Sequence, residues 1–409
     1  MNKKTRLFGL LVIVKMLVIA VISCSNGIFP DGSYTNTGRG NAWRVPGYTV
    51  IEQLEWLQEN AQSNRNYIVV ARLNEPLIPG NNNFGIIYSG RENITVIITT
   101  IDGIPRQTLW TYGTGAMLNV GPSNTLILDN INLQVSDTPI QWDWLVKVNG
   151  GKLQMTNSVI SGNSTGRGVH VTQGVFYMGS GAVIHSNRGG VSAYYVSRVY
   201  MHGNASIRNN TMVSLFGGFG GIGGGVLLDI STLTMRDNAE IRNNYAAFSG
   251  GGVMASASSL THGSHVYMFD NASIHSNVTQ DGGGIFVDQM ASFSTAPSTL
   301  NMHGKNVRIS GNRTVSFGGS NRGGGVFLGS TYRLNISGGT IYGADANPGL
   351  ANTVTNPYGY GAVLIRTFSG DIRVGTFCSG LGFEPCGFTI FTTTVGMNNT
   401  VRVVDGVLQ

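Results

Sequence analysis

Charged side chains are scarce in this sequence. Asp, Glu, Lys and Arg make up 11% of its 409 residues, whereas roughly a quarter of the residues are charged in globular proteins. There are 26 Lys and Arg against 20 Asp and Glu, but four of the cations lie near the N-terminus, and without them the balance is 22 against 20. No basic cluster remains elsewhere, so no nucleic-acid partner is expected.

A long apolar run is also missing. The most apolar stretch, Leu7 to Ile22, is interrupted by Lys15, and each part is far shorter than the ~20 residues of a membrane-spanning helix. Cations precede this stretch and Val21-Ile22-Ser23-Cys24 ends it, which resembles the signal peptide of bacterial lipoproteins. The resemblance implies that residues 1–23 are removed, that Cys24 is lipidated, and that the lipid attaches the protein to the bacterial outer membrane or cell surface. An uncleaved membrane anchor is the alternative.

Cysteine is rare too, with three in the chain. If Cys24 carries the lipid, Cys378 and Cys386 remain, in a Gly-rich region near the C-terminus. Their short separation in an exported protein predicts a local disulfide; two buried free thiols are the alternative.

The sequence lacks the residue sets that mark a metal centre or a nucleophile. His262 and His265 lie three residues apart, but no Cys or acid at ligand spacing accompanies them. Most other histidines recur at fixed places in a repeat. We therefore predict no metal site and no cofactor, with a weak Ca²⁺ site as the only exception considered.

What the sequence does contain is a repeat. The stretch from Gly223 to Asn244, GGGVLLDISTLTMRDNAEIRNN, returns in variant form from Gly250, from Gly282 and from Gly323. One methionine marks each unit, and the series is Met155, Met178, Met201, Met235, Met268 and Met302, continued by Ile336. The first two intervals are 23 residues and the later ones 33 or 34, so we expect a core unit lengthened by loops. Such a unit must stack on its neighbours to bury its apolar face.

Within a unit the apolar residues alternate, as in Val226 and Leu228 or Leu233 and Met235. Period two is the pattern of short strands with one buried face. Three such strands per coil, with coils stacked roughly 4.8 Å apart, predict an all-β, single-stranded, right-handed parallel β-helix. A capping box at Thr49 followed by apolar residues at helical spacing predicts an N-terminal capping helix.

Asparagine recurs at two repeat positions, and we expect each set to form a hydrogen-bonded ladder. One set is Asn204, Asn238 and Asn271, and the other is Asn187, Asn210, Asn244, Asn277 and Asn312.

These features divide the chain into five parts. Residues 1–23 form the signal peptide, 24–48 a flexible tether, 49–66 the helical cap, 67–343 the β-helix repeats, and 344–409 the final coils and a C-terminal cap. We expect a monomer.

The repeats resemble those of polymorphic outer-membrane proteins and autotransporter passengers. The residues that carry the resemblance are Gly-Gly-Gly-Val or Gly-Gly-Gly-Ile followed by Met-x-x-Asn-Ala, as at Met201, Met235 and Met268. They also resemble the larger group of pectate-lyase-like β-helices. The first resemblance implies surface display and, in some members, adhesion to host or neighbouring cells. The chain departs from autotransporters because too few residues follow Gly343 to form their membrane barrel.

Aromatic residues in or beside predicted strands are the candidate binding residues. They are Trp110, Tyr112, Trp142, Trp144, Tyr194, Tyr195 and Tyr200. If they face outward, they form a strip able to stack on sugar rings or to dock a partner; if inward, they fill the wide early coils.

Two acids, Asp237 and Asp270, share a repeat position in adjacent coils and precede Asn in a turn. Turn formation explains them, while the alternative is an acidic groove of a polysaccharide lyase or glycoside hydrolase. The function predicted from sequence is thus a non-catalytic surface lipoprotein that binds a glycan, a host protein or a matrix protein. The alternatives are the carbohydrate-active enzyme and a structural spacer in the envelope.

Overall fold

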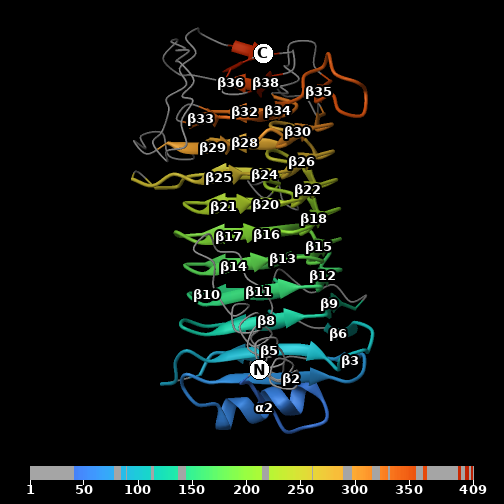
Figure 1. Cartoon of the computed structure of the whole chain (residues 1–409), viewed down its shortest axis with the longest axis vertical. Coiled ribbons are helices and arrows are strands. Elements are labelled where there is room, and N and C mark those ends of the chain that lie inside the picture. The colour runs from blue at the N-terminus through green and yellow to red at the C-terminus, as the bar shows by residue number, and fades with distance from the viewer. Residues whose placement is uncertain are drawn as a thin grey trace, which may run out of the picture.

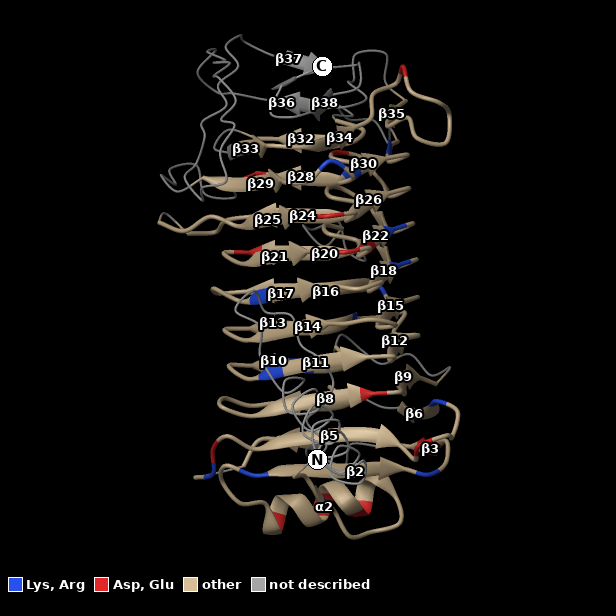
Figure 2. Cartoon of the chain, in the orientation of Figure 1, with Lys and Arg blue, Asp and Glu red and all other residues tan. Residues whose placement is uncertain are grey.

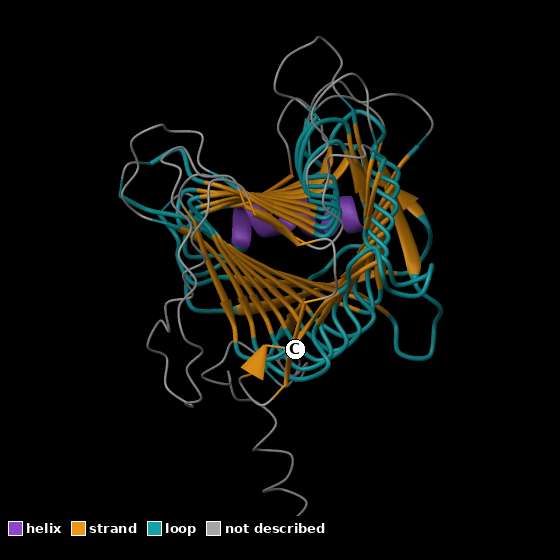
Figure 3. Cartoon of the chain, turned by 90° about the horizontal axis from the view of Figure 1, so that it is seen from above, coloured by secondary structure: helices purple, strands orange, loops and turns teal. Residues whose placement is uncertain are grey.

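The chain folds into a parallel β-helix, as the sequence predicts (Figure 1). The computed structural model describes residues 41–77, 84–88, 90–111, 115–136, 144–213, 221–259, 261–288, 297–315, 323–329, 332–355, 363–365, 395–397, 401–404 and 407–408. Charged residues are sparse along the whole stack (Figure 2). Seen from one end, the stacked strands enclose one long core (Figure 3).

Four sheets run along the stack, and we number them in the order in which a coil visits them. Sheet I contains β4 (Phe84–Ile86), β7 (Leu118–Val120), β10 (Val146–Asn149), β13 (Arg167–Thr172), β16 (Gly189–Tyr194), β20 (Val226–Asp229), β24 (Val253–Ser256), β28 (Ile285–Val287), β32 (Val326–Leu328), β36 (Val363–Ile365) and β37 (Val395–Met397). Sheet II contains β1 (Trp43–Arg44), β2 (Asn66–Ala71), β5 (Thr95–Thr100), β8 (Thr125–Asp129), β11 (Lys152–Thr156), β14 (Val175–Met178), β17 (Arg198–Met201), β21 (Thr232–Met235), β25 (His265–Met268), β29 (Ser298–Met302) and β33 (Tyr332–Ile336).

The other two sheets complete each coil. Sheet III contains β3 (Glu75–Pro76), β6 (Gln107–Thr111), β9 (Ile131–Val135), β12 (Val159–Ser161), β15 (Val183–His185), β18 (Ser206–Arg208), β22 (Glu240–Arg242), β26 (Ser273–His275), β30 (Arg308–Ser310), β34 (Gly339–Ile341), β38 (Val401–Val404) and β39 (Val407–Leu408). Sheet IV contains β19 (Thr211–Met212), β23 (Tyr245–Ala246), β27 (Val278–Thr279), β31 (Arg313–Thr314) and β35 (Thr353–Val354).

Sheet IV is a feature that the sequence analysis missed. The prediction was three strands per coil with loops accounting for the longer period, and three strands do form the shorter coils. From β19 onward each coil adds a two-residue strand, and the glycine-rich corner follows it. The lengthening from 23 to 34 residues is therefore partly regular structure.

The methionine series forms a continuous column inside the helix. Met155 pairs in register with Met178, and the same register continues through each later strand of sheet II to Ile336. All these side chains are buried. Identical repeat positions therefore stack directly on one another, because every strand pairs with its counterpart one coil away without a shift in register.

The second asparagine set forms the expected ladder, in the corner between sheets III and IV. From Asn210 to Asn312, each side-chain Oδ1 accepts from the backbone N–H and from the Nδ2 of the asparagine one coil before it, at 3.0–3.2 Å. Each Nδ2 also donates to a backbone carbonyl inside the coil below, as Asn244 does to Ile207 at 3.0 Å. The ladder extends to Asn163 and Asn352, which the sequence analysis did not include.

The first asparagine set behaves differently because it lies on the surface. Asn204, Asn238 and Asn271 are exposed. Nδ2 of Asn271 donates to Oδ1 of Asn238 at 3.1 Å, while Oδ1 of Asn204 accepts from the backbone of Gly181. The amide ladder thus forms only in part.

The three glycines of each repeat close the corner between sheets IV and I. The first of them has a positive φ of 59° to 65° at Gly223, Gly250, Gly282 and Gly323, which non-Gly residues rarely adopt. The third, as at Gly225, packs against the asparagine ladder.

Helix α2 (Val50–Asn60) covers the N-terminal end of the stack (Figure 1). Thr49 and Glu52 form the predicted capping box, and Leu54 and Leu57 are buried against the first coil. The side-chain amide of Gln53 bonds both the N–H and the C=O of Val70 in β2, at 2.8 and 3.0 Å. The cap therefore provides hydrogen-bond partners for backbone groups of β2 and also covers apolar surface at the end of the stack.

Both ends of the stack differ from the expected organisation. Strand β1 lies within the segment predicted as a tether and pairs with β2 as the first strand of sheet II. At the other end, β37, β38 and β39 pair antiparallel to their neighbours, where further parallel coils were expected. Cys24, Cys378 and Cys386 lie outside the described residues, as do the signal peptide and most of the tether. Among the described residues, no helix is long and apolar enough to cross a membrane.

Candidate functional site

The outer face of sheet II carries a column of aromatic and polar side chains. Strand alternation turns the methionine and leucine positions inward, so the residue before each methionine points outward. In register from β11 to β29, these outward residues are Gln154, Tyr177, Tyr200, Thr234, Tyr267 and Asn301. We call this set the tyrosine column.

The aromatic rings of this face are stacked. Tyr177 and Tyr200 lie 4.8 Å apart between centroids with 10° between their planes, and Tyr267 is nearly parallel to Phe269 at 6.4 Å. Phe269 in turn stacks on His303 at 5.2 Å, and the guanidinium of Arg236 lies 4.4 Å from its centroid. Partial burial raises the pKa of the Tyr177 hydroxyl above that of an ordinary tyrosine, which is already protonated at neutral pH.

Amides and hydroxyls continue the column toward the C-terminal end. Nδ2 of Asn335 donates to Oδ1 of Asn301 at 2.6 Å, and Nδ2 of Asn301 donates to Oγ1 of Thr299 at 2.7 Å. Asn301 and Thr299 are buried, so these bonds hold the C-terminal part of the column together, and the groups of this face that a sugar can reach are its half-buried tyrosines.

A second aromatic group lies on the outer side of sheet I and at its corner with sheet II. Trp144 stacks on His170 at 4.1 Å, and His170 lies 5.3 Å from Tyr194. The next two residues, Tyr195 and Val196, are 54% and 63% exposed and both have positive φ. For a β-branched residue such as Val196 this conformation is strained.

The seven aromatics predicted from sequence do not form a single strip. Trp110 lies on β6 of sheet III, Trp144 and Tyr194 belong to the sheet I group, and Tyr200 belongs to the tyrosine column. Tyr112 and Trp142 lie outside the described residues. Tyr177 and Tyr267 were not among the predicted residues, although each directly precedes a repeat methionine as Tyr200 does.

The two candidate acids are engaged in turns. Oδ2 of Asp237 accepts from the backbone N–H of Gly203 at 2.8 Å, and Oδ2 of Asp270 accepts from the N–H of Asp237 at 3.1 Å. Both residues have positive φ. These contacts agree with a role in forming the turns. Among the described residues, no group of three or more His, Cys, Asp or Glu could hold a metal ion.

One carboxylate is surrounded by donors on the outer face of sheet III. Glu240 receives a weak contact from His275 at 3.5 Å, an ion pair with Nε of Arg242 at 2.7 Å and a hydrogen bond from Ser206 at 2.9 Å. The His275 contact is the main cause of the lowering of the Glu240 pKa to about 2, with Arg242 and Ser206 adding to it.

Replacing Glu240 with glutamine should therefore cost about 1 kcal/mol of unfolding free energy at pH 7, after allowing for solvent screening. The folded-state pKa lies below the unfolded value of about 4.3, so this contribution is complete above pH ~5 and declines as the pH falls toward 2. Urea unfolding of both proteins at pH 7, 4 and 3 would measure it. A difference that stays constant across these three values would contradict the assignment.

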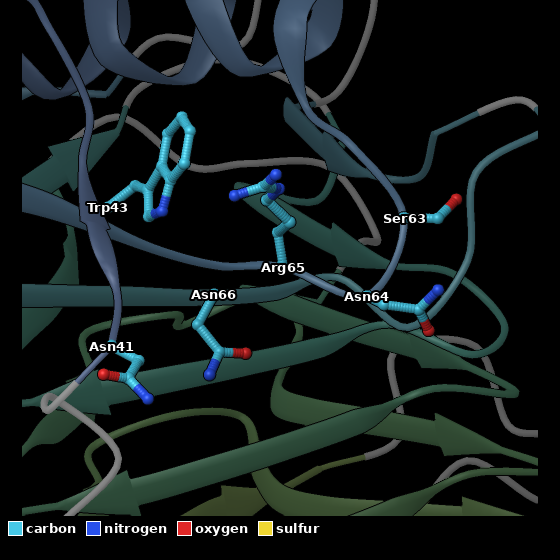
Figure 4. A pocket seen from close by; sticks show the side chains of 6 residues that line it. All are labelled: Asn41, Trp43, Ser63, Asn64, Arg65 and Asn66. Carbon is cyan, nitrogen blue, oxygen red and sulfur yellow. The ribbon is translucent and has the colours of Figure 1, made fainter.

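A shallow hollow lies at the N-terminal end of the stack (Figure 4). It has a volume of about 340 Å³ and is lined by Asn41, Trp43, Ser63, Asn64, Arg65 and Asn66. The guanidinium of Arg65 lies 4.2 Å from the Trp43 ring centroid, so it covers part of that ring. The lining includes no carboxylate, and the hollow offers no acid or base pair for catalysis.

No family model and no curated protein matches the chain. One solved structure that is similar is pectin methylesterase from Aspergillus niger in deglycosylated form, at 13% sequence identity and a TM-score of 0.31. The match covers 69% of this chain and 92% of that one. A similarity this weak transfers no activity, and the fold assignment follows from the strand pairing itself.

Proposed function

We propose that this protein is a non-catalytic β-helix that binds glycans through the outer face of sheet II. The observation that supports the proposal most strongly is the stacked pair Tyr177 and Tyr200, which continues in register into polar side chains. The edges of the stacked rings give an extended sugar chain an apolar strip along the coil axis, and the tyrosine hydroxyls supply hydrogen bonds.

The location proposed for this activity is the bacterial outer membrane or cell surface. It follows from the lipoprotein-like N-terminus, in which Cys24 would carry the lipid. In this arrangement the lipid holds the N-terminal end and the stack presents sheet II along its length, as an adhesin would need. The enzyme alternative has less support, because Asp237 and Asp270 use their carboxylates to bond turns.

Changing Tyr200 to alanine should weaken glycan binding about tenfold, because one stacked ring contributes on the order of 1 kcal/mol. The measurement is a glycan array followed by dissociation constants for the best ligand, with the same wells read for substrate breakdown.

Tyr245→Ala is the matched control, since this half-buried tyrosine lies on sheet IV, away from the tyrosine column. An equal loss of glycan affinity in the two variants would show that the tyrosine column is not the binding site. If the wild type breaks the glycan down and Asp270→Ala does not, the protein is an enzyme and the binding proposal is wrong. If the wild type neither binds nor degrades any glycan, the structural spacer is the function that remains.

A further inference from the structure

The charge of the sheet II face points to the kind of glycan. On the six strands from β11 to β29, three outward columns run side by side: the tyrosine column, the residues two positions before it and the residues two positions after it. These positions include Lys152, Arg198 and Arg236 and no Asp or Glu.

The carboxylates that flank this face are held by other groups. In the corner before β21, Asp229 accepts from the N–H and Oγ of Ser258 at 2.8 and 2.7 Å. In the corner after sheet II, Asp237 and Asp270 bond backbone N–H groups of the turns. Asp129, one coil below the face, is 3% exposed. Asp237 and Asp270 are nevertheless exposed at the edge of the face, so the absence of acids holds for the three columns themselves and not for the turns beside them.

The cations lie beside the aromatic rings. Lys152 and Arg198 are exposed, lie two coils apart in one column, and are therefore separated by roughly 10 Å along the stack. Arg198 is two residues from Tyr200, and it is close enough to Tyr177 to act against the increase that burial causes in the tyrosine's pKa. Arg236 lies over the ring of Phe269, and both belong to the column two positions after the tyrosine column.

From this arrangement we propose that the ligand is a polyanionic polysaccharide, carrying carboxylate or sulfate groups at intervals along its chain. The outer edges of the stacked Tyr177 and Tyr200 rings contact the sugars, while Lys152 and Arg198 pair with the acidic substituents. The inference rests on the proposed glycan binding and adds the charge of the ligand to it.

The test uses one polymer backbone in three forms: dextran, carboxymethyl-dextran and dextran sulfate. Dissociation constants are measured with the purified protein at low and at high salt. We expect at least one anionic form to bind about tenfold more tightly than dextran at low salt, with the advantage shrinking as salt rises. Which anionic form binds distinguishes carboxylate from sulfate recognition.

Two variants assign the effect to this face. In Lys152→Gln with Arg198→Gln, the preference for the anionic forms should fall at least threefold while binding to dextran is unchanged. Arg308→Gln is the control, because Arg308 is equally exposed but lies on sheet III. It should leave the preference intact.

The outcomes separate the two proposals. Equal binding of all three polymers that is weakened by Tyr200→Ala would keep the glycan-binding function and overturn the polyanion inference. Anion binding that survives both Tyr200→Ala and the double variant would also overturn it, as attraction unrelated to sheet II. Binding of none of the polymers would overturn the inference, and the array described above would then decide the function by itself.

Discussion

Replacing Asn244 with alanine should lower the free energy of unfolding by about 3 to 5 kcal/mol. The side chain is 1% exposed and sits in the middle of the asparagine ladder. Its Oδ1 accepts from the backbone and the side chain of Asn210, and its Nδ2 donates to Asn277 and to the Ile207 carbonyl. Alanine removes all four bonds and takes this partner away from the buried N–H of Asn210 and from the carbonyl of Ile207. Equilibrium urea unfolding would measure the loss.

Asn238→Ala is the matched control. This asparagine belongs to the same coil but is exposed, and its Oδ1 accepts one bond from Asn271. Its loss should cost below about 1 kcal/mol because water replaces the missing partner. Similar losses for the two variants would show that burial of the ladder does not determine its contribution.

Replacing Gly225 with alanine should cost about 3 kcal/mol. An added Cβ would lie 2.6 Å from the carbonyl oxygen of Gly252 and 2.8 Å from Cγ2 of Ile241. The first of these atoms is backbone in the next coil, so the strain cannot be relieved by rotating a side chain. The φ of Gly225 is not in the left-handed region, so the cost is steric and not conformational.

Gly349→Ala provides the comparison for this prediction. Its added Cβ would meet no atom within 4 Å, and its φ is not positive either. That variant should be neutral or slightly stabilising, since alanine restricts the unfolded chain. The two proteins can be compared by thermal and urea unfolding. A tolerated Gly225→Ala would mean that the coils can separate locally, contrary to the tight stacking described here.

Residues that recur at a fixed repeat position could be placed from the sequence. Met155, Met178 and their successors marked the repeat period and stack in one column, and the asparagine series that includes Asn244 forms the predicted ladder. The reason is that a parallel coil pairs each strand with its own counterpart, so equal repeat positions become neighbours. The helix after Thr49 was predictable as well, because its capping box is a local signal.

The candidate site was predicted less well. Trp110, Trp144 and Tyr200 were grouped by residue type and strand spacing, yet they lie on three different sheets. Residue spacing within a strand indicates which residues share a side of that strand. It does not indicate which sheet the strand joins, and the three sheets face in different directions because the turns between them are corners. Sheet IV was missed because its two-residue strands are too short for alternation to be visible.

By itself, then, the sequence determined the coil, its register, its internal columns and its helical cap, since these follow from local pattern and from repetition. The tertiary structure decided which outward columns share a face, that the acids beside sheet II are directed into turns, and that the last strands run antiparallel. Those features depend on contacts between residues at different repeat positions. Such contacts form only when the coils stack, so the repeat pattern does not predict them.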